Sequence, residues 1–374
     1  MRRQEQSLHA RPPRERRVTR ERARRRGVSL LQPLRAECTI FPAKTALMLL
    51  LTLFLSLTFA RRSPEARAQP GAMTPPPRAA SSVVQTPPPP VFDAERAFTH
   101  VRKLVEFGPR PAGSAELGRA REYIVSELKS SGLKVERDEF GAKTPVGKRK
   151  MVNVWAELPG ETRDLIIIAS HYDTKLFKDA RFVGANDGGS STGVLLEAAR
   201  VLAASTRRNH FTYRFVFFDG EEAFCREWDE CGKPGAPDNT YGSRRYVERL
   251  RERKELGRVR ALILLDMVGY RELDLGRDTL STTWLLDIIW ETARALGYGK
   301  QFNARPEVIG DDDHAPFLRA GVAAVDLIQL STYPHWHTPA DTLDKISPRS
   351  LGAVGEVVLA SLPRIEKRLR EFRG

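Results

Sequence analysis

This 374-residue sequence has few cysteines, no visible internal repeat and no hydrophobic run of membrane-spanning length. Of its three cysteines, Cys225 and Cys231 lack both the short spacing and the second pair typical of a zinc-binding cysteine site. No internal repeat is visible, so a repeat architecture is not indicated. The apolar run within residues 45–60 is shorter than the roughly 20 residues of a membrane span.

A large positive charge is present, but it is unevenly distributed. The net charge is +14, and residues 1–70 contain 16 basic and 5 acidic residues, which leaves +3 for residues 71–374. We therefore interpret residues 1–44 as a basic disordered tail and expect no nucleic-acid partner.

The segment after this tail indicates export. Residues 45–60 resemble the apolar region of a signal peptide, and Ala66–Ala68 offers a small-residue cleavage site. Residues 45–68 are therefore predicted to be a signal peptide or an N-terminal anchor, with a possible membrane tether through residues 45–60. The protein would be periplasmic or secreted. In that setting Cys225 and Cys231 could form a loop disulfide or remain two free thiols.

Residues 69–91 are rich in proline and are predicted to be a linker, so the folded part is expected at 92–374. Strand patterns alternate there with helical patterns, which predicts an α/β fold with a mostly parallel central sheet flanked by helices as a single domain. Strands are expected at 134–140, 151–158, 164–171, 213–218, 261–266 and 322–330, and helices at 92–107, 115–132, 188–205, 282–297 and 348–372.

Acids and histidines follow the predicted strands. Ligands bind at the carboxyl ends of strands in open α/β sheets, so these side chains should meet at one edge. Histidine and carboxylate are zinc ligands. Taken singly, each candidate could instead be a turn, cap or loop residue. Together they predict a metal site, with candidates His171, Asp173, Asp187, Glu221, Glu222, Asp266, Asp312, Asp313, His314 and His337.

The adjacent pair Glu221 and Glu222 follows the run "YRFVFF". Two neighbouring carboxylates repel each other unless a positive group lies beside them. We interpret one as a metal ligand and the other as a general base.

The ordered motifs "SHYDTK", "GANDGGSSTG", "FFDGEEAF", "YGSR", "LLDMVG", "DDDHAPFL" and "WHTPADT" resemble the zinc-dependent M28 metallopeptidase superfamily, and within it the glutaminyl cyclases. The resemblance spans roughly residues 92–370 and implies a zinc aminopeptidase-like α/β-α sandwich. It implies one zinc ion bound by Asp187, Glu222 and His337, with a second site at His171 and Asp266 as an option. It assigns Glu221, Asp266 and Asp312 to catalysis, and Trp228, Trp336 and Phe317 to substrate binding.

The implied activity converts the N-terminal glutamine of peptides or proteins to pyroglutamate, with release of ammonia. Lys175, Trp228 and Trp336 favour a cyclase, whereas Asp326 departs from it because animal cyclases have histidine there. The alternative is a di-zinc aminopeptidase, whose ligands the sequence also contains. A non-enzymatic anchored binding module is the third reading.

Overall fold

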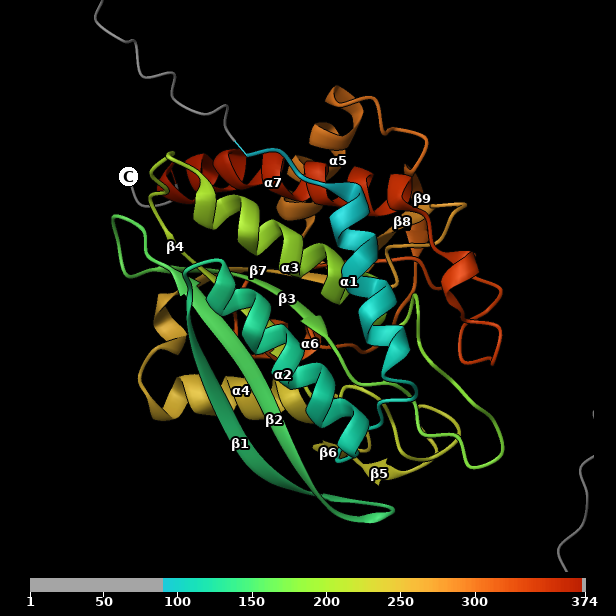
Figure 1. Ribbon diagram of the computed structural model, residues 1–374. Coiled ribbons are helices and arrows are strands. Elements are labelled where there is room, and N and C mark those ends of the chain that lie inside the picture. Colours follow the sequence, from blue (N-terminus) through green and yellow to red (C-terminus); the bar gives the residue numbers. More distant parts are fainter. Residues whose placement is uncertain (1–89, 372–374) are drawn as a thin grey trace, which may run out of the picture. The chain divides into compact units, whose positions relative to one another are not determined.

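The computed structural model describes residues 90–371 (Figure 1). The interpretations of residues 1–44 and 45–68, and nearly all of the predicted linker 69–91, lie outside this range. Cys38 lies outside it as well. Within residues 90–371, no helix combines the length and the apolar composition that crossing a membrane requires.

A six-stranded mixed sheet forms the centre of the described chain, in the order β1-β2-β4-β3-β7-β10. Strands β3, β4, β7 and β10 run parallel to one another, whereas β2 pairs antiparallel with both β1 and β4. The expectation of a mostly parallel sheet is thereby confirmed. The strands are β1 (Lys134–Thr144), β2 (Gly147–Leu158), β3 (Leu165–His171), β4 (Thr212–Phe218), β7 (Val259–Asp266) and β10 (Ala324–Ile328).

Helices cover both faces of this sheet (Figure 1). The larger layer comprises α1 (Ala94–Glu106), α2 (Ala115–Ser130), α3 (Gly189–Ala204), α5 (Thr283–Ala295) and α7 (Pro348–Glu371). The smaller layer comprises α4 (Tyr241–Glu252) and α6 (Ala315–Arg319). Asp93 caps the N-terminus of α1, because its side chain accepts hydrogen bonds from the N–H groups of Glu95 and Arg96.

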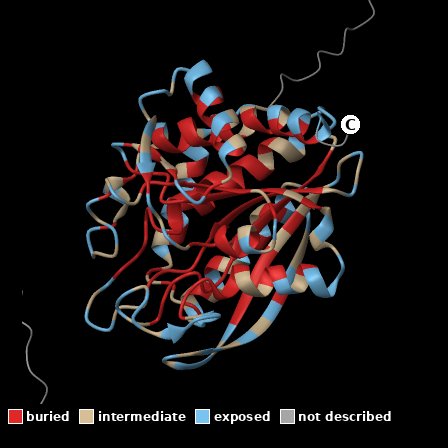
Figure 2. Ribbon diagram, turned by 180° about the vertical axis from the view of Figure 1, so that it is seen from behind, coloured by how far each residue is buried: buried red, intermediate tan, exposed pale blue. Residues whose placement is uncertain are grey.

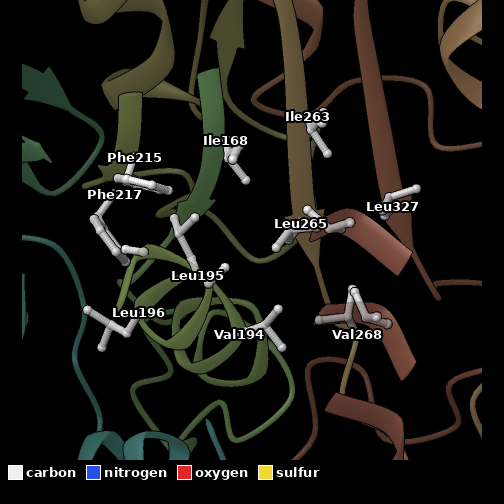
Figure 3. Packing of buried hydrophobic residues seen from close by; sticks show 14 of the residues in the cluster. Ile168, Val194, Leu195, Leu196, Phe215, Phe217, Ile263, Leu265, Val268 and Leu327 are labelled. Atoms are coloured by element: carbon white, nitrogen blue, oxygen red, sulfur yellow. The ribbon is translucent and has the colours of Figure 1, made fainter. Parts of the chain in front are cut away.

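Strand β3 shows how the two cores are built. All seven of its residues are buried, and alternate side chains point to opposite faces of a strand. Ile166 and Ile168 pack with the larger helix layer, whereas Leu165 and Ile167 pack with the smaller one. Figure 3 shows Ile168 in the larger core, opposite Leu195 of α3. Figure 2 shows the buried strands between partly exposed helices, so the uninterrupted apolar runs reflect burial on both faces.

Several elements were not expected from the sequence. Helix α4 carries many charged residues, and half of its residues are buried, among them Tyr246, Val247 and Leu250. Two small sheets also form, one from β5 (Gly232–Lys233) with β6 (Ala236–Pro237) and one from β8 (Leu275–Asp278) with β9 (Phe302–Glu307). The 3-10 turns Leu256–Arg258 and Leu343–Lys345 complete the described elements.

Candidate active site

The carboxyl ends of the parallel strands place the predicted acids together. His171 is the last residue of β3, Asp266 is the last residue of β7, and Glu221 follows the end of β4. A cavity of about 210 Å³ lies at this edge. Its lining includes these predicted site residues: Asp187, Glu221, Glu222, Trp228, Asp266, Asp312, Trp336 and His337.

Asp187, Glu222 and His337 form one metal-ligand set, and all three line this cavity. His337 Nε2 lies 3.1 Å from Glu222 Oε2 and 3.5 Å from Asp187 Oδ2. Two ligands at zinc-bond lengths around a tetrahedral ion lie roughly 3.3 Å apart, so these spacings fit zinc. Both carboxylate oxygens of Glu222 and Oδ2 of Asp187 are buried without a hydrogen-bond partner in the described chain. Buried carboxylate oxygens without hydrogen bonds require either a proton or a nearby positive charge, which a cation or a protonated His337 would supply.

The charges at this set also fit a cation. Burial, followed by the charge of Glu222, raises the pKa of Asp187 to about 7. Burial also opposes ionisation of Glu222, but contact with His337 outweighs it and lowers the pKa of Glu222 to about 2. One carboxylate is therefore held ionised while its neighbour is pushed towards protonation. A divalent ion between them would stabilise both charges.

A second set shares Asp187 with the first. His171 Nε2 lies 3.1 Å from Asp266 Oδ1 and 3.3 Å from Asp187 Oδ1. Burial by itself would lower the pKa of His171, but the surrounding carboxylates, Asp266 foremost, raise it well above its usual value. The geometry therefore accommodates either a second metal ion or a charged histidine held between carboxylates.

A sharp turn projects the adjacent glutamates into the cavity. Gly220 has φ +75°, and an added Cβ would meet Met151 at 2.6 Å, so the turn favours glycine. Asp173 then accepts hydrogen bonds from two consecutive N–H groups, that of Glu221 at 3.1 Å and that of Glu222 at 3.4 Å. Asp173 is thus a support for the turn rather than a member of the ligand sets.

Glu221 lies beside both sets without belonging to either. Its Oε2 is 3.7 Å from His171 Nδ1. Burial and then the charge of Glu222 raise the pKa of Glu221 well above its usual value, although His171 opposes the shift. On the opposite side, burial and then Asp266 raise the pKa of Asp312 to about 6. A carboxyl group in this position can hold and release a proton near neutral pH.

Two of the three predicted substrate-binding aromatics line the cavity. Trp336 stacks on His337 with ring centroids 4.2 Å apart and remains 40% exposed, and Trp228 lies in the same lining. Phe317 does not line it. It is fully buried in the core beneath α4 and packs against Phe218 and Tyr246, so the structure contradicts its assignment to the pocket.

Other candidates lie outside the cavity lining. Asp313 is fully buried, and His314 sits between Asp278 at 3.2 Å and Asp326 at 3.6 Å. Asp326 therefore belongs to a buried cluster behind the cavity.

Asp341 is a site residue that was not among the candidates predicted from the sequence. It is fully buried, and its carboxylate accepts hydrogen bonds from the N–H groups of Asn186 and Asp187. The signal was an acid four residues after His337 within "WHTPADT", where it could equally be a loop residue.

The structure also settles the two alternatives for the cysteines, because Cys225 and Cys231 are disulfide-bonded.

The sequence and fold of this chain match those of known proteins. The model of peptidase family M28 matches residues 153–362, which is more than half of the chain. The chain belongs to peptidase family M28. This M28 member is 31% identical over 282 residues to a glutaminyl-peptide cyclotransferase-like protein of Mus musculus, covering 68% of this chain and 71% of that protein. M28 peptidases and glutaminyl cyclases depend on zinc, and the buried acid and histidine sets suit that ion.

Solved structures agree on the fold. The crystal structure of a glutaminyl cyclase from an Acidobacteriales bacterium matches with TM-score 0.69 and 33% identity, covering 78% of this chain and 100% of that one. A leucine aminopeptidase precursor from Bacteroides thetaiotaomicron matches with TM-score 0.67 and 28% identity, covering 74% and 98%. The zinc aminopeptidase-like α/β architecture is therefore shown, and cyclase homologues are prominent among the relatives.

Proposed function

We propose that this M28 member is a glutaminyl-peptide cyclotransferase, which converts N-terminal glutamine to pyroglutamate and releases ammonia. The observation that carries the proposal is the form of the cavity. At about 210 Å³ it is smaller than typical ligand pockets, and Trp228 and Trp336 both line it beside Glu221. Such a chamber suits one flat amide side chain, and the relatives named as glutaminyl cyclases point the same way.

Zinc is the expected cofactor, and Asp187, Glu222 and His337 would hold it. Bound there, the ion would polarise the γ-carbonyl of the substrate glutamine and lower the barrier to attack on that carbon. One ion is expected. The alternative is a second ion bound at His171 and Asp266.

Glu221 carries the proton transfers in this proposal. It accepts a proton from the α-ammonium group, and the resulting amine attacks the γ-carbon to form the five-membered ring. Glu221 then gives that proton to the departing amide nitrogen as the C–N bond breaks, and ammonia leaves. The ring nitrogen loses its remaining extra proton to solvent, so atoms and charge balance. Nucleophile and electrophile belong to one residue, so correct positioning supplies much of the rate.

Asp266 and Asp312 are proposed to orient the amide nitrogen. Because burial and Asp266 raise the pKa of Asp312 to about 6, Asp312 can alternate between hydrogen-bond donor and acceptor near neutral pH. The indole N–H of Trp228 is buried without a partner in the described chain, so a bound carbonyl group would satisfy it.

The proposed partners are peptides or proteins with N-terminal glutamine, outside the cytoplasm. The Cys225–Cys231 disulfide supports an oxidising compartment, and the segment 45–68 supports export. Membrane anchoring through residues 45–60 remains the alternative to release.

The test is incubation of the full chain with the peptide Gln-Phe-Ala, followed by mass spectrometry. The expected product is a peptide that has lost the mass of one ammonia and whose peptide bonds are intact. Free glutamine together with Phe-Ala would instead establish the di-zinc aminopeptidase, which the shared set of His171, Asp187 and Asp266 favours as the second candidate. An unchanged peptide with zinc present would leave the binding module as the remaining reading.

A further inference from the structure

A seven-residue loop closed by the Cys225–Cys231 disulfide carries one wall of the cavity. Trp228 and Asp229, near the middle of this loop, line the cavity beside the proposed catalytic residue Glu221. Asp229 and Cys231 also line the larger groove of about 620 Å³ on the other side. The loop therefore separates the cavity from this groove, and its position determines the shape of the cavity.

Both ends of the loop are firmly held. Asp238 Oδ2 accepts hydrogen bonds from the N–H groups of Phe224 at 3.0 Å and Cys225 at 2.8 Å, which fixes the first end. At the second end, Gly232 enters the short β5–β6 pairing, which leads back to Asp238. The disulfide joins the two ends covalently.

The middle of the loop is weakly held. Within residues 90–371, a single hydrogen bond joins residues 226–230 to the rest of the chain, from Asn239 Nδ2 to the Trp228 carbonyl at 3.5 Å. The other polar contacts of this segment stay inside the loop, such as Glu227 N–H to Glu230 at 3.1 Å. Arg226, Glu227, Asp229 and Glu230 are exposed. Between its anchored ends, little besides the disulfide therefore restricts the loop backbone.

The segment that anchors the loop also anchors the catalytic turn. The segment that receives the loop continues into Thr240 and Tyr241, whose N–H groups bond to the carbonyls of Glu221 at 2.7 Å and Gly220 at 2.8 Å. A single stretch of backbone thus anchors both the loop and the turn of the proposed general base.

From these contacts we infer that the Cys225–Cys231 disulfide is a positioning device that holds Trp228 against the substrate chamber. It would make substrate binding dependent on the redox state of the compartment. This inference rests on the proposed function and adds a regulatory property to the same site. Reduction would leave Glu221 and the metal ligands in place but would free Trp228, so binding should weaken more than turnover.

The direct test compares the full chain with the double variant Cys225→Ser/Cys231→Ser, using Gln-Phe-Ala. The KM should rise by about 5- to 50-fold, the upper value corresponding to the closure entropy of so small a ring. The kcat should change by less than about twofold, and the zinc content should not change. In a Trp228→Ala background the same double change should alter KM by less than about twofold, because the device acts through Trp228.

Reductant added to the unmodified chain should reproduce the double variant, and it should have no further effect on that variant. Cys38→Ser controls for the third cysteine and should behave as the unmodified chain. An unchanged KM in the double serine variant, or an equal rise with and without Trp228, would overturn the inference.

A second readout does not depend on the reaction. Acrylamide quenching of the Trp228 fluorescence, obtained as the difference from Trp228→Phe, should increase when the disulfide is broken. Unchanged quenching would refute the positioning role whatever peptide the enzyme processes. By contrast, failure of the unmodified chain to cyclise Gln-Phe-Ala would refute the proposed function alone.

Discussion

The carboxylate of Asp341 accepts a hydrogen bond from the backbone N–H of Asp187 at 3.1 Å, across 154 residues of sequence. It also accepts one from Asn186 N–H at 2.9 Å and one from the hydroxyl of Tyr333 at 2.5 Å. Asp341 therefore fixes the backbone of a proposed ligand shared by both metal sets. Outer partners of this kind orient metal ligands.

Replacing Asp341 by alanine should lower zinc affinity by about 10- to 100-fold, the range found when such outer partners are lost. The physical reason is that two backbone N–H groups lose their common acceptor. The measurement is competition with a chelator of known affinity. Asp341→Asn is the matched control, because it keeps a carbonyl acceptor and should lose less. A zinc affinity of the alanine variant equal to that of the unmodified chain would show that the backbone at Asp187 keeps its position without Asp341.

The adjacent glutamates allow a paired test with one chemical change. Glu221→Gln should lower kcat by roughly 10²- to 10⁴-fold through loss of the proton carrier, with zinc still bound. Glu222→Gln should instead weaken zinc binding, because one ligand charge is removed. Metal content and kcat are measured on both variants. Loss of zinc from Glu221→Gln would reverse the assignment of the two residues, as would full occupancy in Glu222→Gln.

Metal removal should abolish turnover and lower the melting temperature, since the buried acids Asp187 and Glu222 would lose their counter-charge. Back-titration with zinc then counts the sites. One equivalent should restore full activity, and His171→Ala should leave that stoichiometry unchanged. A requirement for two equivalents that falls to one in His171→Ala would favour the di-zinc alternative.

Asp219 predicts how stability depends on pH. It is fully buried and accepts a hydrogen bond from Val152 N–H at 2.8 Å, and burial, followed by Asp173, raises its pKa to about 8. Its pKa in the unfolded chain is about 3.9, so between these values the folded state binds the proton more tightly. The free energy of unfolding should therefore fall with rising pH over this window, by up to about 1.4 kcal/mol per pH unit from this group.

Denaturant unfolding at several pH values tests this linkage. Asp219→Asn keeps an acceptor for Val152 N–H but cannot ionise, so its stability curve should be flatter between about pH 4 and pH 8. Asp287→Asn makes the same change at a partly exposed side chain of α5 and serves as the surface control. A slope in Asp219→Asn as steep as in the unmodified chain would show that other groups dominate.

The sequence by itself determined the α/β architecture and the edge at which the site forms. Uninterrupted apolar runs such as 165–169 predicted strands buried on both faces, and all six predicted strands are present in the sheet. Since parallel strands end on one side, the acids at their ends had to meet. Neither inference required knowledge of any contact between distant residues.

Only the tertiary structure decided matters that depend on distant contacts. The family resemblance assigned Phe317 to substrate binding, but Phe317 of α6 is buried in the core against Phe218. Asp341 gained its role from the fold, because no local pattern identifies the partner of a buried carboxylate. Spacing permits, but does not require, the pairing of Cys225 with Cys231. The chain path through Asp238 brings those ends together, since hydrogen bonds and packing far from the loop determine where its backbone runs.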